Sequence, residues 1–299
     1  MSISGWMGLA VAVSLAVLPA RAAGKVKVLI VDGQNNHNYR AMTPFMKVQL
    51  EKTGRFAVDV STSPPQKSPS SSWDSWRPAF AQYDVVMSNY NGEPWPEPVQ
   101  KAFVKHVWEG GGAVIVHAAN NAFPGWTEYD RMIGLGWRPA QYSDRVFLDD
   151  EGRLVRLPPG RDVGAGHGAQ HEFQIRVRMP GHPVTKDMPL KWMHAKDELY
   201  HGQRGPAESF NLLATAYSDP KAGGTGKHEP MAWWVPYGKG KVFTTVMGHV
   251  SGESIPGIEC VGFVTVMNRA CEWVATGVVT IPVPADFPTE TEVRLVPKP

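Results

Sequence analysis

One stretch, Gly111-Gly112-Ala113-Val114-Ile115-Val116-His117-Ala118-Ala119-Asn120, carries most of the information about the fold of this chain. A glycine turn leads into a short apolar run, which ends in a histidine followed by small residues. Such a run predicts a strand that is buried on both faces of a parallel sheet. Ligands of open α/β sheets bind at the carboxyl ends of these strands, so His117 is predicted to lie at a binding site. The alternative is a core histidine hydrogen-bonded to a neighbour.

The segments before this stretch repeat an alternation of strand and helix. Strands are predicted at residues 28–31, 56–60 and 84–88, and helices at residues 43–53 and 96–109. The intervening residues 61–78 are rich in Ser and Pro and are predicted to form a surface loop. This order predicts an α/β protein with a doubly wound, mostly parallel, flavodoxin-like sheet.

The second half of the chain is predicted to be rich in strands. Strands are expected at residues 171–178, 211–217, 231–236 and 241–246, with a short strand or bend at 197–200 and a helix at 259–276. Residues 138–170 are predicted to be irregular. We therefore expect one α/β domain over residues 24–280, with a strand-rich C-terminal elaboration, and an extended tail over residues 281–299.

Composition and charge narrow the class of protein. The 299 residues are 42% hydrophobic and 19% charged, with a net charge of +2, which predicts a folded chain with a sizeable core. Acidic and basic residues are mixed without a basic stripe, which argues against a nucleic-acid partner. Cys260 and Cys271 lie on or beside one predicted helix, about 16 Å apart, too far for a disulfide. Both are predicted to be free, buried thiols.

The N-terminal residues 1–23 are predicted to be a signal peptide. An apolar run over residues 9–18 is followed by Ala20-Arg21-Ala22, a small-x-small cleavage pattern. The run is short for a membrane span, so a secreted or periplasmic protein without stable membrane insertion is expected. The alternative is a retained N-terminal anchor, because no Lys or Arg precedes the apolar run.

Common catalytic and nucleotide-binding motifs are absent from the sequence. At the strand-to-helix turn where acyl-transfer enzymes carry a nucleophilic Ser or Cys, this chain has His117. Neither a Gly-x-Gly-x-x-Gly pattern nor a P-loop occurs, which argues against a nucleotide cofactor. The Gly-rich residues 164–168 follow no predicted strand.

Histidines and a carboxylate spread along the chain are the candidates for chemistry. His249 follows a predicted strand as His117 does, and Glu198 lies in Asp197-Glu198-Leu199-Tyr200. Imidazole and carboxylate together suit a divalent metal such as zinc with open positions for a substrate. They equally suit acid/base catalysis without a metal. The predicted catalytic residues are His117, His249 and Glu198, and the predicted metal ligands are these three together with His171.

A small carbohydrate is the expected ligand. The chain has 11 Trp, whose faces can stack on sugar rings, although most Trp side chains are expected in the core. The predicted substrate-binding residues are Asp32, His37, Asn38, Asn91, Trp95, Asn120 and Tyr200. Trp126 and Trp137 flank the same loops. The remaining histidines are predicted to be structural or solvated: His106 on a helix surface, His182 in a turn, and His167, His194, His201 and His228 in polar loops.

Several short motifs resemble the ThuA-like (trehalose utilisation) family over residues 25–277. They are residues 28–31 leading to Asn36-His37-Asn38, the stretch 111–117, Gly181-His182-Pro183, residues 197–200, Gly238-Lys239-Gly240-Lys241-Val242 and Met247-Gly248-His249. The resemblance implies a fold similar to class I glutamine amidotransferases without their nucleophilic Cys. Where other members carry a second histidine soon after the strand-end one, this chain has Asn120 and Asn121.

The resemblance also implies a role in sugar metabolism through 3-keto-glycosides. The expected activity is elimination and hydration of such a substrate by acid/base chemistry, with or without a metal. The alternatives are a non-catalytic carbohydrate-binding protein and a metal-dependent hydrolase of another substrate.

Overall fold

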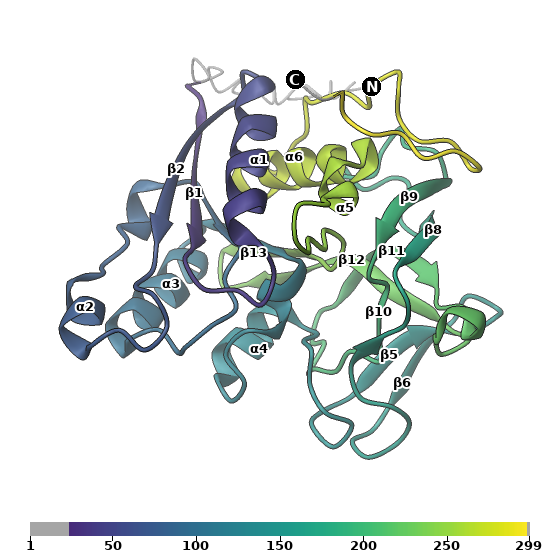
Figure 1. The fold of residues 1–299 in the computed structure, drawn as a ribbon, viewed down its shortest axis with the longest axis horizontal. Coiled ribbons are helices and arrows are strands. Elements are labelled where there is room, and N and C mark those ends of the chain that lie inside the picture. The colour runs from purple at the N-terminus through teal and green to yellow at the C-terminus, as the bar shows by residue number, and fades with distance from the viewer. Residues whose placement is uncertain (1–23, 298–299) are drawn as a thin grey trace, which may run out of the picture.

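Five strands that run in one direction form the first half of an 11-stranded sheet (Figure 1). Their order is β2 (Phe56–Thr62), β1 (Val26–Asp32), β3 (Val85–Ser88), β4 (Gly112–Val116) and β13 (Gly240–Thr245). The computed structural model describes residues 24–297, so the predicted signal peptide lies outside the described residues. The predicted doubly wound, mostly parallel α/β fold is confirmed, with β4 between β3 and β13 inside the parallel part.

The second half of the sheet is antiparallel. It continues from β13 through β12 (His228–Tyr237), β11 (Asn211–Tyr217), β8 (His171–Val177) and β9 (Lys191–Asp197). A hairpin of β5 (Arg145–Leu148) and β6 (Leu154–Leu157) joins at β12, and β7 (Gly166–His167) pairs separately with β10 (Tyr200–His201). The prediction that residues 138–170 are irregular is therefore wrong, and β9 was not predicted.

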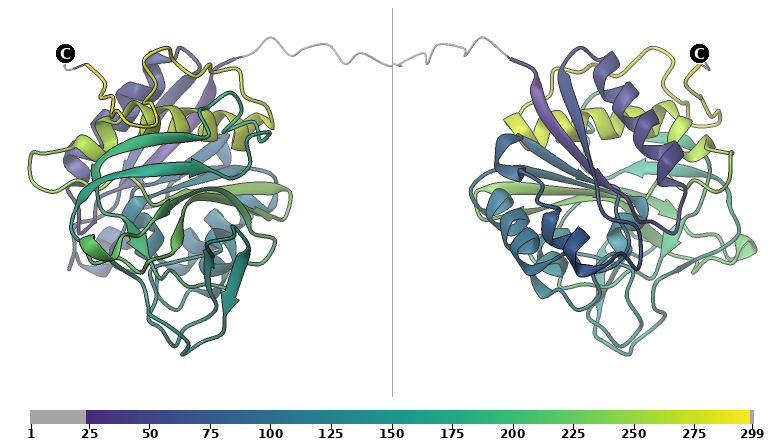
Figure 2. Two further views of the ribbon diagram at one scale, coloured as in Figure 1. Left: turned by 90° about the vertical axis from the view of Figure 1, so that its right-hand side faces the viewer. Right: turned by 60° about the vertical axis from the view of Figure 1, so that its left-hand side comes forward.

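Helices cover both faces of the parallel part of the sheet (Figures 1 and 2). One face carries α1 (Tyr39–Lys52) and α6 (Val261–Thr276), and the other carries α3 (Glu97–Trp108) and α4 (Thr127–Ile133). Short α2 (Ser70–Ser75) lies inside the predicted loop 61–78, and short α5 (Pro256–Glu259) precedes α6. Within residues 24–297, three 3₁₀ turns complete the elements: Phe80–Gln82, His117–Asn121 and Pro220–Ala222.

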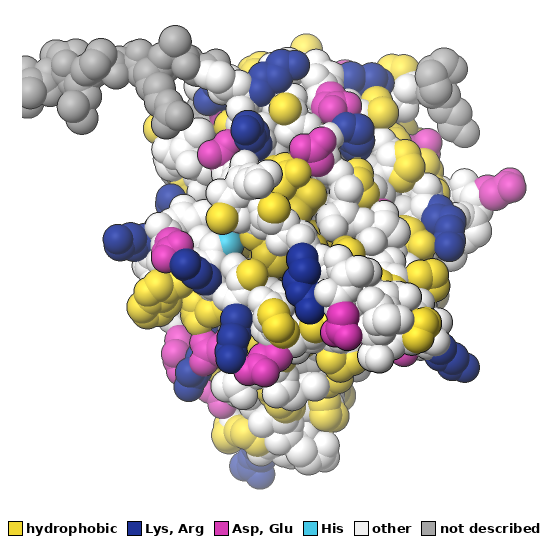
Figure 3. Space-filling view, turned by 90° about the vertical axis from the view of Figure 1, so that its left-hand side faces the viewer, with side chains coloured by type: hydrophobic (Ala, Val, Ile, Leu, Met, Phe, Trp, Pro, Cys, Tyr) yellow, Lys and Arg dark blue, Asp and Glu magenta, His cyan; other side chains and the backbone are white. Residues whose placement is uncertain are grey.

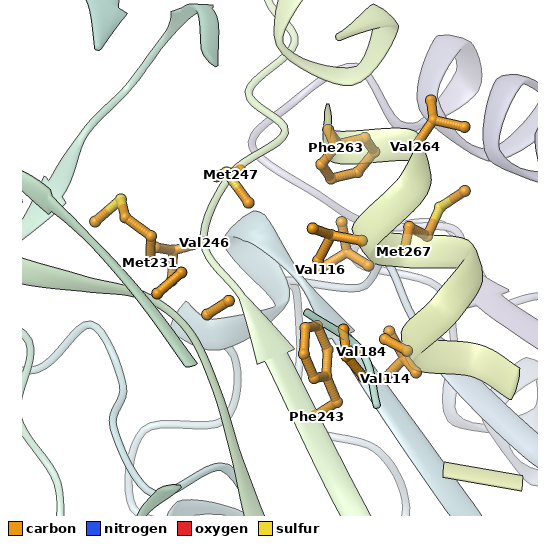
Figure 4. Close-up of a cluster of buried hydrophobic side chains, with 14 of the residues drawn as sticks. Val114, Val116, Val184, Met231, Phe243, Val246, Met247, Phe263, Val264 and Met267 are labelled. Carbon is orange, nitrogen blue, oxygen red and sulfur yellow. The ribbon is translucent and has the colours of Figure 1, made fainter. Parts of the chain in front are cut away.

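Alternate residues of the central strands supply the two hydrophobic layers. Val114 and Val116 of β4 contribute to the core beneath α6, together with Phe243, Phe263 and Met267 (Figure 4). Ala113 and Ile115 of the same strand face the core on the α3 side. Because successive strand residues point to opposite faces, a strand that is buried on both sides must be apolar throughout.

Capping residues set the start of α1 and the end of α6. The side chain of Asn38 accepts a hydrogen bond from the backbone N–H of Ala41 at 3.3 Å, so α1 begins at Tyr39, earlier than predicted. At the other end of the fold, Gly277 adopts a left-handed conformation with φ of 78° and ends α6.

Three further observations bear on the predictions from composition. Cys260 and Cys271 are free and buried, as predicted. Among the residues that the structure describes, no helix combines the length and apolar character needed to cross a membrane. On the face shown in Figure 3, Lys and Arg side chains are interspersed with Asp and Glu side chains.

Candidate functional site

Four side chains that are distant in sequence converge at one edge of the sheet. They are His37, His117, Glu198 and His249, and one donor atom from each lies within 4.8 Å of the others. His117 is fully buried, and the side chains of His37, Glu198 and His249 are 6%, 9% and 9% exposed. The structure therefore brings together His37, which was predicted to bind substrate, and the three residues that were predicted to be catalytic.

Strand direction explains the convergence. His37, His117 and His249 follow β1, β4 and β13, which are parallel and end at the same edge. Four antiparallel pairings separate β13 from β9, so β9 runs in the same direction as β13 and also ends there, just before Glu198. The sheet curls so that β9 lies against α5 and α6, which brings Glu198 back toward the parallel strands.

His117 occupies a strained turn between β4 and the following 3₁₀ segment. Its φ is +46°, a left-handed conformation that costs a non-glycine residue about 1 kcal/mol or more and is often found at functional sites. The imidazole Nδ1 donates a hydrogen bond to the backbone carbonyl of Val246 at 2.7 Å. Because a carbonyl can only accept, Nδ1 carries the ring proton and Nε2 presents a lone pair to the cluster.

The side-chain oxygen of Asn35 accepts from His37, as the backbone carbonyl of Val246 does from His117. The Nδ2 of Asn35 donates to the backbone oxygen and side-chain oxygen of Asn89 at 3.2 and 3.3 Å, which fixes the orientation of the amide. Its Oδ1 therefore faces His37, accepting from the backbone N–H at 2.9 Å and lying 3.4 Å from ring Nδ1. His37 Nε2 is left as a second lone pair that points into the cluster.

These two lone pairs face each other, since the Nε2 atoms of His37 and His117 are 3.3 Å apart. Two acceptors at this separation repel unless a proton or a cation lies between them. The hydroxyl of Tyr200 lies 3.3 Å from His117 Nε2 and is the nearby neutral donor. The arrangement thus favours a positively charged species at the centre of the cluster.

Glu198 supplies the negative charge of the cluster. Its Oε2 lies 3.5 Å from His37 Nε2, 3.6 Å from His117 Nε2 and 3.1 Å from His249 Nδ1. Burial raises the pKa of Glu198, but the three histidines beside its carboxylate outweigh this effect and hold the pKa well below its usual range. Burial also lowers the pKa of His37, which outweighs the opposing effect of Glu198. An ionised carboxylate and a neutral imidazole are the forms that bind metals.

His249 completes the set and has an unsatisfied nitrogen. Its Nδ1 is buried and makes no hydrogen bond of acceptable geometry, although Glu198 is near. Its Nε2 lies 2.8 Å from the side-chain amide of Gln170. The atom of Gln170 that faces it is the amide nitrogen, but the two amide orientations have the same shape. The orientation with the oxygen toward His249 would let Nε2–H donate to Gln170 and would leave Nδ1 as a lone pair for a cation.

The donor set fits a divalent transition metal. Three imidazoles and a carboxylate are common zinc ligands, with metal–ligand bonds of about 2.0–2.2 Å. Such bonds place neighbouring donors about 2.8–3.6 Å apart at octahedral to tetrahedral angles, a range that includes the 3.1, 3.3, 3.5 and 3.6 Å separations described above. The residues could therefore hold a metal, and the unsatisfied His249 Nδ1 supports this use.

His167 also contacts the cluster, and the sequence prediction missed it. Its Nε2 lies 3.4 Å from Glu198 Oε1 and its side chain is 36% exposed. Its Nδ1 donates to the backbone oxygen of Gly168 at 2.7 Å, so Nε2 carries a lone pair. The ring stacks near Tyr200 at 6.3 Å between centroids, with Trp137 at 5.9 Å. His167 thus marks the side of the cluster that is open to solvent.

The Gly-rich residues 164–168 explain the position of His167. A Cβ at Gly168 would collide with the carbonyl of Ala222, and a Cβ at Gly202 would collide with the carbonyl of Gly164. Backbone therefore packs directly on backbone, which lets β7 pair with β10 beside Glu198. The Gly-His-Gly pattern at residues 166–168 is the sequence signal that could have pointed to His167. It can be interpreted only once the distant segments that pack against it, at Gly202 and Ala222, are known.

The other predicted site residues lie outside the cluster. Asp32 accepts from Thr62 at 2.7 Å, Asn91 donates to Asn36 at 2.6 Å, and Asn120 donates to the carbonyl of Leu135 at 2.5 Å. Asn38 caps α1, and its Nδ2 donates to the carbonyl of Gly252 at 2.9 Å, so it ties α1 to the loop after His249.

Two predicted site residues have mainly structural contacts. Trp95 is 2% exposed and packs among Phe80, Phe103 and Phe123 in the core. His171 donates from Nδ1 to the carbonyl of Ala169 at 2.7 Å and packs against Phe173, without contact to the cluster.

Four of the histidines predicted to be at the surface or solvated are buried instead, namely His106, His194, His201 and His228. His194 Nε2 donates to Asp197 at 2.6 Å. Burial lowers the pKa of His194, but Cys260 and the hydrogen bond to Asp197 outweigh it and raise the pKa to about 9. His194 and Asp197 therefore form a buried ion pair directly behind Glu198.

Comparison with known proteins identifies the fold and its relatives. A family profile described as "ThuA: Trehalose utilisation" matches residues 27–274. A ThuA-like protein from Parabacteroides merdae is 41% identical, with a TM-score of 0.87 over 91% of this chain and 98% of its own. A second one, from Bacteroides uniformis, is 19% identical, with a TM-score of 0.54 over 88% of this chain and 97% of its own. No curated protein matches the sequence.

Proposed function

The chain belongs to the ThuA (trehalose utilisation) family, and from this premise we propose that it is a metal-assisted enzyme that cleaves 3-keto-glycosides. The observation that carries the proposal is the pair of opposed Nε2 lone pairs of His37 and His117 beside the Glu198 carboxylate. A divalent cation bound by His37, His117, His249 and Glu198 would act as a Lewis acid toward substrate oxygen atoms. The family's link to carbohydrate supports a sugar as the substrate.

The substrate approaches from the side of His167 in this proposal. That side chain is the most exposed of those in contact with Glu198, and its Nε2 carries a lone pair that can accept a proton. Trp137 and Tyr200 lie beside it, with ring centroids 4.6 Å apart, and provide aromatic surface for a sugar ring. In the proposal, His167 Nε2 therefore acts as the base.

The proposed reaction uses the acidity that a C3 ketone gives to the C2 proton. His167 Nε2 accepts this proton, and the electron pair left on C2 forms a C1=C2 double bond as the C1–O bond breaks. The leaving oxygen keeps the bonding pair and takes the proton that His167 accepted, which releases the aglycone and restores neutral His167. Water then adds its hydroxyl to C1 and its proton to C2, so the net change is hydrolysis. Tyr200 can donate a hydrogen bond to substrate oxygen during these steps.

Export is a part of the proposal that rests on the sequence of residues 1–23 alone. A signal peptide there would deliver the enzyme to the periplasm or the exterior. Its substrate would then be an extracytoplasmic oxidised sugar. N-terminal sequencing of the mature protein tests this part separately from the chemistry.

The test is a panel of 3-keto and unoxidised disaccharides incubated with the zinc- or cobalt-loaded protein and read by mass spectrometry. We expect cleavage of 3-keto substrates only. His117→Ala should lower turnover by at least about a hundredfold, because it removes a ligand, whereas His228→Gln, in the antiparallel half, should retain it. If no 3-keto substrate is consumed, or if His117→Ala is fully active, the proposal is wrong. Sugar binding without turnover would favour a carbohydrate-binding protein.

A further inference from the structure

The carboxylate of Asp197 connects the two backbone segments that carry Glu198 and His249. Its Oδ1 accepts from the backbone N–H of Glu198 at 2.7 Å and from that of His249 at 2.9 Å. Its Oδ2 accepts from the backbone N–H of Gly248 at 2.7 Å. One side chain therefore fixes the end of β9 against the loop that follows β13.

A fourth donor completes the environment of Asp197. His194 Nε2 donates to Oδ2 at 2.6 Å, and both side chains are fully buried. Each carboxylate oxygen thus accepts two hydrogen bonds. Charge-assisted bonds of this kind are stronger than neutral ones, and a buried carboxylate without them would be costly. The contacts hold Asp197 rigidly in one position.

The surrounding backbone leaves room for this carboxylate. A Cβ built at Gly257 would lie 2.8 Å from Asp197 Oδ2 and 3.0 Å from Cγ. Real Cβ atoms do not approach so closely, so only glycine fits at this position of α5 without displacing Asp197. The absence of a side chain at residue 257 is therefore a second sign that the placement of the carboxylate is specified.

We propose that Asp197 is a positioning residue for metal binding: it sets the distance between Glu198 and His249 so that both can ligate one ion. The inference rests on the metal part of the proposed function. Hydrogen-bonded groups behind metal ligands commonly change metal affinity about 10–100-fold when removed. Asn at this position has one acceptor oxygen and a donor amide, so it cannot serve four donors.

The test compares cobalt(II) binding by the wild-type protein and Asp197→Asn, because the visible absorption of cobalt(II) reports the arrangement of its ligands. We expect the variant to bind cobalt at least tenfold more weakly and with an altered spectrum, while retaining the wild-type circular dichroism spectrum. Gly257→Ala, which displaces the carboxylate without removing it, should weaken binding by a smaller factor. This second variant keeps the test decisive if Asp197→Asn does not fold.

Glu272→Gln is the matched control. Glu272 is also a fully buried carboxylate that accepts from backbone, namely the N–H groups of Thr280 and Ile281 at 2.7 and 3.0 Å, but it holds the C-terminal tail. This variant should lose stability and keep wild-type cobalt affinity and spectrum. If folded Asp197→Asn also keeps both, the inference is wrong and the proposed function stands. If the wild-type protein binds no cobalt, the metal part of the proposed function fails, and the inference with it.

Discussion

The role of each histidine in the cluster is determined by the group that holds its other nitrogen. His117 and His249 could be predicted as site residues because His117 directly follows β4 and His249 comes shortly after β13, which is a local pattern. Which ring nitrogen of His117 carries the proton could not be predicted, because this depends on the backbone carbonyl of Val246, which is 129 residues away. His167 was missed for a similar reason: its glycine neighbours suggest a solvated loop until the segments packed against them are known.

Protonation of His228 is expected to make stability depend on pH. Burial, together with the charges of Arg176 and Arg178, lowers the pKa of His228 from 6.5 to about 4. The unfolded chain therefore binds a proton at this residue before the folded protein does. The contribution of neutral His228 to the free energy of unfolding is fully present above pH 6.5. As the pH falls toward about 4, this contribution is lost and the free energy of unfolding decreases by on the order of 1–2 kcal/mol.

Urea denaturation at pH 7 and at pH 4.5 measures this effect. His228→Gln should lose less stability over that interval than the wild-type protein, since the glutamine does not titrate. Equal losses in the two proteins would contradict the assignment to His228.

Elements with a local apolar pattern were predictable, and elements defined by distant partners were not. The strand at residues 211–217 was predicted with the bounds of β11, and the parallel strands were found within a few residues. In contrast, β9 mixes Lys, Trp, His and Ala, and only its pairing with β8 reveals it as a strand. Because Glu198 directly follows β9, the failure to predict this strand also left the position of Glu198 in the cluster unexplained.

Packing of α6 on β9 gives a prediction for stability. A Cβ built at Gly262 would lie 2.7 Å from Cε3 and from Cη2 of Trp192, which is 1% exposed. Alanine gains up to about 1 kcal/mol in helix propensity, but overpacking a rigid core costs about 1–3 kcal/mol. Gly262→Ala should therefore lower the free energy of unfolding in chemical denaturation.

Gly181→Ala is its control, because nothing lies within 4 Å of a Cβ at residue 181. The control should be close to neutral. A Gly262→Ala variant as stable as the wild type would show that Trp192 can move, and that α6 and β9 are less tightly packed than described.

The whole molecule contributes to the cluster, since its residues span positions 37 to 249 and both halves of the sheet. The fold class followed from the order of strands and helices, and the edge where the parallel strands end followed from topology. The curl that returns β9 to this edge depends on contacts of α5 and α6 with β9. No local pattern encodes such a contact, so Glu198 could be named as a candidate from its residue type, but its position beside the three histidines could not be derived from the sequence.

A metal that binds all four residues should stabilise the entire fold. Free metal at a hundredfold excess over its dissociation constant adds about 2.7 kcal/mol. For a chain of this size, this should raise the Tm by roughly 5–10 °C. Thermal unfolding with zinc or cobalt and then with excess chelator measures the shift, which should reverse. His117→Ala should show little shift, and an equal shift in that variant would place the metal elsewhere.

The late position of His249 has a consequence for biosynthesis. A nascent chain on the ribosome contains His37, His117 and Glu198 long before it contains residue 249, and β13, which positions that residue, is also made late. An unfinished polypeptide therefore lacks one member of the cluster and the strand beside β4. If the cluster holds an ion, the complete set of four ligands exists only in chains that extend beyond residue 249.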